Sequence, residues 1–182
     1  WSGGKDGLVL QKICELAGIK RAVLFITSLE FKDYLDFVEE YKPPYVEVVK
    51  TKHDLEWLKN NPNRLFPETS KERGKYFIEV QRNGLKKYFK DNKLDQVVTG
   101  HRNHDGNHCP NDLTINNDGY VQNNIIKDWT HEDVLSFLFY NNIALPKIYY
   151  YDYGFIDGTG CYPSITRKGR TIEQMWGYVY KY

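Results

Sequence analysis

The sequence predicts an α/β fold in which helices cover both faces of a mainly parallel sheet, giving three layers. Short apolar runs typical of buried strands alternate along the chain with stretches whose apolar residues recur at helical spacing. The composition, with 41% hydrophobic and 27% charged residues, is that of a globular domain with a sizeable core. We therefore expect residues 1–182 to form a single domain. Because the chain opens directly on a glycine-rich motif, we also expect a strand to precede it, and a tail could follow it.

The first part of the chain supplies two helices, each followed by a strand. Residues 5–17 present an apolar face and end before a glycine, which predicts a helix. The continuous apolar run 21–27 (RAVLFIT) predicts a strand buried on both faces. Helical spacing from Phe31 onward predicts a second helix that ends before Pro43, and residues 45–49 alternate as a strand.

The alternation continues through the middle of the chain. We expect a short helix at 53–59 and a longer, charged helix at 71–90. Residues 95–100 (DQVVTG) predict another short strand that ends at a glycine, and 101–125 predict a polar loop rich in Asn and Asp.

A last helix is expected from residue 130 to about residue 140. Thr130 is a good N-cap, and Asp133 occupies the N3 position of a capping-box-like arrangement. The segment that follows is rich in Gly and Tyr.

Three loops fall where a parallel sheet binds its ligands. Residues 2–7, 27–31 and 99–106 each follow an observed or inferred strand. The carboxyl ends of parallel strands share one edge of the sheet, and ligands bind in the crevice beyond that edge. We therefore expect the three loops to line one site.

Residues 2–7 (SGGKDG) carry the sharpest chemical signal. Glycines let the backbone turn tightly and approach a ligand, while the helix that follows directs its N–H groups and positive dipole end at the loop. Lys5 adds a positive charge. The loop is not a Walker A motif, because the GxxxxG spacing is missing and Asp6 follows the lysine. It predicts a seat for the phosphate or sulfate end of a nucleotide, with an unliganded turn as the alternative.

Five segments in the same order resemble the phosphoadenosine phosphosulfate (PAPS) reductase family, within the adenine-nucleotide alpha-hydrolase-like superfamily. They correspond to its SGGKDS loop, the segment after its second strand, its TGxR and DWTxxDV motifs, and its YDxGY…GC segment. In this chain they are residues 2–7 (SGGKDG), 24–31 (LFITSLEF), 99–102 (TGHR), 128–134 (DWTHEDV), and 151–155 (YDYGF) with 160–163 (GCYP).

The resemblance implies an adenine nucleotide at the strand ends. The segment after the second strand helps to seat the adenosine, and Arg102 approaches the nucleotide. A basic cluster at Arg167 and Arg170 is a solvated face by default, but a 3′-phosphate or phosphosulfate would also favour it. The residues expected to bind the nucleotide are Ser2, Gly3, Gly4, Lys5, Asp6, Gly7, Thr27, Leu29, Gly100, Arg102, Arg167 and Arg170.

For a complete reductase, the resemblance implies that a thiolate attacks the sulfate sulfur and that thioredoxin or glutaredoxin cleaves the resulting thiosulfonate. The family's Glu-Cys-Gly-Leu-His-like tail does not occur before Tyr182. The catalytic residue is therefore unassigned. Cys161 is a candidate if Arg167 or Arg170 lowers its pKa, whereas Cys14 is expected in the core and Cys109 in a loop.

Two departures keep other functions open. Gly7 replaces the serine of the family's loop, and the expected catalytic thiol is missing. One alternative is an ATP-dependent enzyme of the same fold that adenylates a substrate or transfers sulfur, which would require Mg²⁺. The other is a non-catalytic nucleotide-binding or interaction module.

Composition limits cofactors and partners. Three separated cysteines cannot supply the four thiolates of an iron–sulfur cluster, and we expect no tightly bound cofactor. One loop is crowded with side chains that can bind metals, but their spacing matches no familiar zinc site, so we expect no metal site. They are His101, His104, Asp105, His108 and Cys109. A net charge of +1 predicts no bulk attraction to nucleic acid. No apolar run is long enough to span a membrane, and the cysteine usage fits a reducing compartment, so we expect a cytoplasmic protein, with a homodimer as an option.

Overall fold

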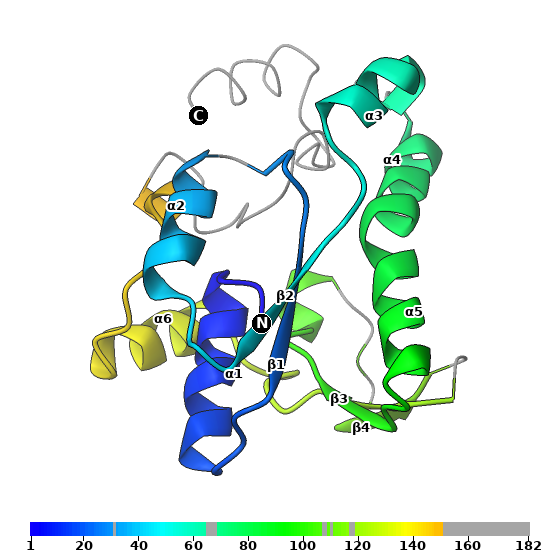
Figure 1. Ribbon diagram of the computed structural model, residues 1–182. Coiled ribbons are helices and arrows are strands. Elements are labelled where there is room, and N and C mark those ends of the chain that lie inside the picture. The colour runs from blue at the N-terminus through cyan, green and yellow to red at the C-terminus, as the bar shows by residue number, and fades with distance from the viewer. Residues whose placement is uncertain (31, 65–68, 107–108, 110, 117–118, 151–182) are drawn as a thin grey trace. The chain divides into compact units, whose positions relative to one another are not determined.

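The structure is a computed structural model that describes residues 1–150 except 31, 65–68, 107–108, 110 and 117–118 (Figure 1). The chain divides into two compact units that interleave in the sequence. The first comprises Trp1–Ala22 and Lys86–Leu145, and the second comprises Val23–Leu85 and Pro146–Tyr182.

The first unit contains a small mixed sheet. Its strands lie in the order β3-β5-β4. Strand β3 (Gln96–Val98) pairs parallel with β5 (Val121–Asn123), and β5 pairs antiparallel with β4 (Leu113–Ile115). The parallel pair agrees with the predicted α/β class.

The β4–β5 hairpin corrects one prediction. The sequence predicted a loop throughout 101–125, because runs of three residues surrounded by Asn and Asp give too short an alternation to recognise. Two backbone hydrogen bonds close the turn between the strands: the Asn116 N–H donates to the Tyr120 carbonyl, and the Gly119 N–H donates to the Asn116 carbonyl. Gly119 has φ +88°, a conformation that favours glycine.

Two helices of the first unit pack against each other, α1 (Lys5–Leu16) and α6 (His131–Tyr140) (Figure 1). Helix α1 buries Leu8, Val9 and Leu10, and it ends where Gly18 adopts φ +76°. Both helices confirm the predicted periodicity.

The predicted capping box of α6 is also confirmed. The Thr130 hydroxyl accepts from the N–H of Asp133, and the Asp133 carboxylate accepts from the N–H of Thr130. These reciprocal bonds satisfy two backbone donors at the helix start. Val134 and Leu138, one turn apart, face the core.

The second unit contains β2 (Val46–Lys50) and, from its second residue onward, β1 (Ala22–Ile26), and these two strands pair. Its remaining elements are the helices α2 (Lys32–Tyr41), α3 (Leu55–Asn60) and α4 (Ser70–Phe77) and the 3₁₀ turns η1 (Pro62–Arg64) and η4 (Lys147–Tyr150). Its order of strands and helices follows the prediction.

The predicted helix 71–90 is interrupted rather than regular. After α4 the chain forms a π-helical turn, η2 (Ile78–Arg82), and then continues as α5 (Asn83–Asp91). The π turn places Val80 in the core against Trp57. An extra residue in one turn shifts the apolar face, which a search for a constant helical period does not register.

Candidate functional site

Residues 2–7, hereafter the anion loop, comprise the turn before α1 and the start of that helix, which begins at Lys5. Gly3 has φ +64°, and Gly4 occupies the N-cap position with an extended backbone and no side chain to cap the helix. The Ser2 hydroxyl accepts from the N–H of Gly4 at 3.3 Å. This geometry directs the start of a twelve-residue helix, with its positive dipole end, toward the loop.

Gly7, where the family's loop has a serine, packs closely against Ser2. A Cβ at this position would lie 2.5 Å from the Ser2 hydroxyl oxygen and 3.0 Å from the Ser2 backbone nitrogen. Any side chain at position 7 would therefore displace Ser2.

Gly100 lets the segment after β3 approach the first turn of α1. A Cβ on Gly100 would lie 2.9 Å from the Cβ of Asp6, which is closer than van der Waals contact allows. Gly100, predicted as a nucleotide-binding residue, is thus also a residue that brings two segments of the first unit together.

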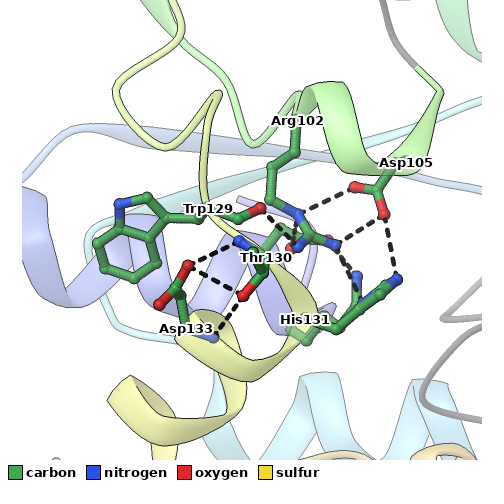
Figure 2. A network of polar contacts seen from close by, with 8 residues as sticks. Arg102, Asp105, Trp129, Thr130, His131 and Asp133 are labelled. Atoms are coloured by element: carbon green, nitrogen blue, oxygen red, sulfur yellow. Dashed lines mark hydrogen bonds and ion pairs between the residues drawn. The ribbon is translucent and has the colours of Figure 1, made fainter.

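Arg102 lies at the centre of a group of charged side chains, hereafter the arginine cluster (Figure 2). Its side chain is 0% exposed. The guanidinium binds the Asp105 carboxylate through two hydrogen bonds, Nε–Oδ2 at 3.0 Å and Nη2–Oδ1 at 2.7 Å, and donates to the Trp129 carbonyl at 3.2 Å. The cluster consists of Lys5, Asp6, Arg102, Asp105 and His131.

Asp6 connects the cluster to the anion loop. Its Oδ2 lies 2.7 Å from Lys5 Nζ, and its Oδ1 lies 3.0 Å from Arg102 Nε. The Nε group has only one hydrogen, which points at Asp105, so the buried Asp6 Oδ1 accepts no hydrogen bond from any described residue. The Arg102 contact is therefore an ion pair without a hydrogen bond.

The cluster is close to neutral. Lys5 and Arg102 carry two positive charges, and Asp6 and Asp105 carry two negative ones. The sequence predicted that both basic side chains serve the nucleotide. In this structure each forms an ion pair with a carboxylate of the same unit. Attraction for an anion at the loop then comes chiefly from backbone N–H groups and the helix dipole.

His131 is a member of the cluster that the sequence did not single out. Its Nδ1 lies 3.4 Å from Arg102 Nη2, and its Nε2 lies 3.9 Å from Asp105 Oδ1 (Figure 2). Its ring packs edge-on against that of His104, with 4.8 Å between the ring centroids. Burial lowers the pKa of His131, and the positive charges of Arg102 and Lys5 lower it further. The only sequence signal was its position inside the DWTHEDV motif.

The two described cysteines are poor nucleophiles. Burial raises the pKa of both Cys14 and Cys109, which keeps them as neutral thiols. Cys109 lies in a loop, as predicted, and is buried. The Asn103 side chain donates to the Cys109 carbonyl and accepts from the Cys109 N–H. Cys161 lies outside the described residues.

Of the remaining predicted site residues, Thr27 and Leu29 belong to the second unit. In the second unit, the buried Thr27 hydroxyl accepts from the N–H of Leu29 at 3.0 Å, which forms a tight turn after β1. Next to it, burial raises the pKa of Glu30 to about 8. Arg167 and Arg170 lie outside the described residues.

Metal ligands do not gather in the described part of the chain. Within it, no group of three or more His, Cys, Asp or Glu side chains is arranged to hold a metal ion. His108 lies outside that part, so the absence of a metal site stays a prediction. A search of the described helices finds none long and apolar enough to cross a membrane.

Comparison with known proteins defines the family. The phosphoadenosine phosphosulfate reductase domain matches residues 1–167. The chain therefore belongs to the PAPS reductase domain family, in the adenine-nucleotide alpha-hydrolase-like superfamily, as the five motifs predicted. 

The solved structures support the same fold. The crystal structure of a PAPS reductase from Candida auris, a phosphate complex, matches with a TM-score of 0.61 at 18% identity, over 79% of this chain and 71% of that one. This confirms the predicted α/β fold. An uncharacterized protein of Methanocaldococcus jannaschii is 29% identical over 170 residues. The match covers 89% of this chain but only 39% of that relative, so the chain spans about two fifths of its length.

Proposed function

We propose that this chain binds the anionic end of an adenine nucleotide at the anion loop and is the nucleotide-binding part of a thiol-dependent sulfonucleotide reductase. One observation carries the proposal: a glycine-lined loop opens at the N-terminus of α1 in a chain whose residues 1–167 match the PAPS reductase domain. A loop of this kind places backbone donors and the helix dipole at one point, where a phosphate or sulfate binds.

The arginine cluster supports the loop in this proposal. Arg102 ties Asp6, on the first turn of α1, to Asp105 and to the carbonyl of Trp129. It therefore acts as a positioning residue that fixes the direction of the helix start. The dipole of α1 contributes about 0.3–1 kcal/mol to binding of an exposed anion, and up to about 2 kcal/mol when the anion is partly buried.

The reaction that follows from this function is a two-step reduction. A cysteine thiolate attacks the sulfate sulfur, an S–S bond forms, and the S–O bond breaks with its electron pair leaving on the adenosine phosphate. A dithiol protein, thioredoxin or glutaredoxin, then attacks the enzyme's sulfur, releases sulfite and ends as a disulfide. Because burial raises the pKa of Cys14 and Cys109, the thiolate would come from Cys161 or from outside this sequence.

The test is calorimetric titration with adenosine 3′,5′-bisphosphate, AMP, and ATP with Mg²⁺. It is repeated on Lys5→Ala and on the control Lys12→Ala, which removes a lysine from the same helix away from the loop. Lys5→Ala leaves the Asp6 carboxylate without its ion-pair partner at 2.7 Å, beside the anion. We expect bisphosphate binding to weaken at least tenfold in Lys5→Ala and to be unchanged in Lys12→Ala.

The outcomes separate the candidate functions. Preferential binding of the bisphosphate supports sulfonucleotide reduction and leads to an assay of sulfite release with a dithiol reductant. Preference for ATP with Mg²⁺ favours the adenylating alternative, and nucleotide binding without sulfite release by the full-length protein favours a non-catalytic module. Failure of all three nucleotides to bind contradicts the proposal. The proposal includes a cytoplasmic location, with a homodimer as an option.

A further inference from the structure

His131 can change its charge near neutral pH inside an otherwise balanced group of charges. Arg102 Nη2 can only donate a hydrogen bond, so the Nδ1 that faces it at 3.4 Å carries a lone pair. The imidazole is therefore neutral, with its proton on Nε2, which faces Asp105 Oδ1 at 3.9 Å. A second proton would have to enter on Nδ1, opposite the guanidinium.

Charged groups from three segments face this imidazole. From α1 comes Lys5, from the segment after β3 come Arg102, His104 and Asp105, and from α6 itself comes Glu132. Burial, Arg102 and Lys5 keep the pKa of His131 below its ordinary value, and Asp105 acts in the opposite direction. The balance holds the side chain neutral while the anion loop is empty.

We propose that a doubly charged anion bound at the anion loop is accompanied by the uptake of a proton on His131. This inference rests on the proposed function of the loop. The positive charges of Lys5 and Arg102 are already matched by the negative charges of Asp6 and Asp105. A bound dianion therefore adds negative charge that no described side chain of the cluster offsets. Protonated His131 supplies the missing positive charge, close enough to interact with Lys5 at the loop.

The coupling has a defined pH signature. If binding takes up one proton, affinity rises by up to about tenfold for each unit by which pH falls, between the pKa of His131 in the free protein and that in the complex. The same coupling favours dianions over monoanions, so His131 would contribute to selectivity for a phosphosulfate group.

The probe is adenosine 5′-phosphosulfate, because its phosphosulfate keeps both charges between about pH 5.5 and 8.5 and so does not itself exchange protons. Calorimetry in two buffers of different ionisation enthalpy measures the protons taken up on binding. His131→Asn places an amide oxygen near the position of Nδ1, where it can accept from Arg102 but cannot titrate. His101→Asn is the matched control, because its ring nitrogen bonds the side chain of Gln122 instead.

We expect about one proton to be taken up by the wild type and by His101→Asn near the midpoint of the titration, and none by His131→Asn, whose affinity becomes independent of pH. No proton uptake by the wild type, or uptake that persists in His131→Asn, overturns the inference while leaving nucleotide binding intact. Absence of binding at every pH overturns the proposed function as well.

A second measurement covers the case in which His131→Asn does not fold. The imidazole of His131 is titrated by NMR in the wild-type protein with and without adenosine 5′-phosphosulfate. We expect its pKa to rise when the nucleotide binds. An unchanged pKa in the bound protein contradicts the inference.

Discussion

Replacing Arg102 by methionine removes the guanidinium that holds the arginine cluster together while keeping a side chain of similar length. The wild-type group is fully buried and contacts two carboxylates, a backbone carbonyl and an imidazole. After the change, Asp105 loses both of its hydrogen bonds to Arg102, and the already unbonded Asp6 Oδ1 loses its neighbouring cation.

The expected loss in the free energy of unfolding follows from the burial of the Arg102 side chain. Removing one partner of a buried ion pair typically costs about 3–5 kcal/mol, since the other charge is left uncompensated. The side chains of Asp6 and Asp105 are 23% and 27% exposed, which lets water relieve part of that penalty. We therefore expect Arg102→Met to lower the free energy of unfolding by about 3 kcal/mol, near the lower end of the range.

The assay is denaturant unfolding followed by circular dichroism, with Arg21→Met as the control because Arg21 is exposed. The control should change stability by no more than about 0.5 kcal/mol. The double variant with Asp105→Asn should lose less than the sum of the two single variants, because both remove the same pair. If Arg102→Met costs as little as the control, the buried guanidinium does not organise the site and the reasoning is refuted.

Three further predictions concern single positions. Gly100→Ala should destabilise the protein by about 1–3 kcal/mol in denaturant unfolding, because the new Cβ would lie 2.9 Å from the Cβ of Asp6. The control Gly74→Ala, whose Cβ would meet no described atom within 4 Å, should be neutral or stabilising by up to about 1 kcal/mol. Equal effects of the two substitutions would contradict this prediction. Because the pKa of Glu30 is raised to about 8, its contribution to stability is complete below pH 4.5 and is lost as the pH rises through 8. Glu30→Gln should therefore leave the free energy of unfolding unchanged at acid pH and raise it by about 3–5 kcal/mol above pH 9. An effect that does not depend on pH would argue against this prediction. The Cys109 thiol, 3% exposed and with a raised pKa, should resist alkylation in the native protein at neutral pH and react after unfolding, as followed by peptide mass spectrometry; fast native labelling would show that it is accessible.

Local signals in the sequence were sufficient for most of the helices and strands. The start of α6 was predictable because a capping box is formed by two residues three positions apart. The turn before α1 was predictable for a similar reason, since Gly3 and Gly4 directly precede that helix, whereas anion binding there stays a prediction. The β4–β5 hairpin was missed because each strand offers three residues, too few for a period to be recognised.

The chemical environment of the site depends on contacts between distant segments. The sequence identified Arg102 and Lys5 as positive charges, but their pairing with Asp6 and Asp105 follows only when the segment after β3 meets the start of α1. His131 enters the cluster from a third segment, 29 residues beyond Arg102. Neither burial nor charge balance of this kind can be read from residue spacing.

The most direct test of the central claim is a titration of the isotope-labelled protein with adenosine 3′,5′-bisphosphate, followed by backbone amide NMR. The anion would accept hydrogen bonds from the start of α1, so the account predicts that the largest shift changes occur at the amides of Gly4, Lys5, Asp6 and Gly7, and that they saturate with a single affinity. Saturable binding whose largest changes lie elsewhere, with these four amides unmoved, would contradict the account.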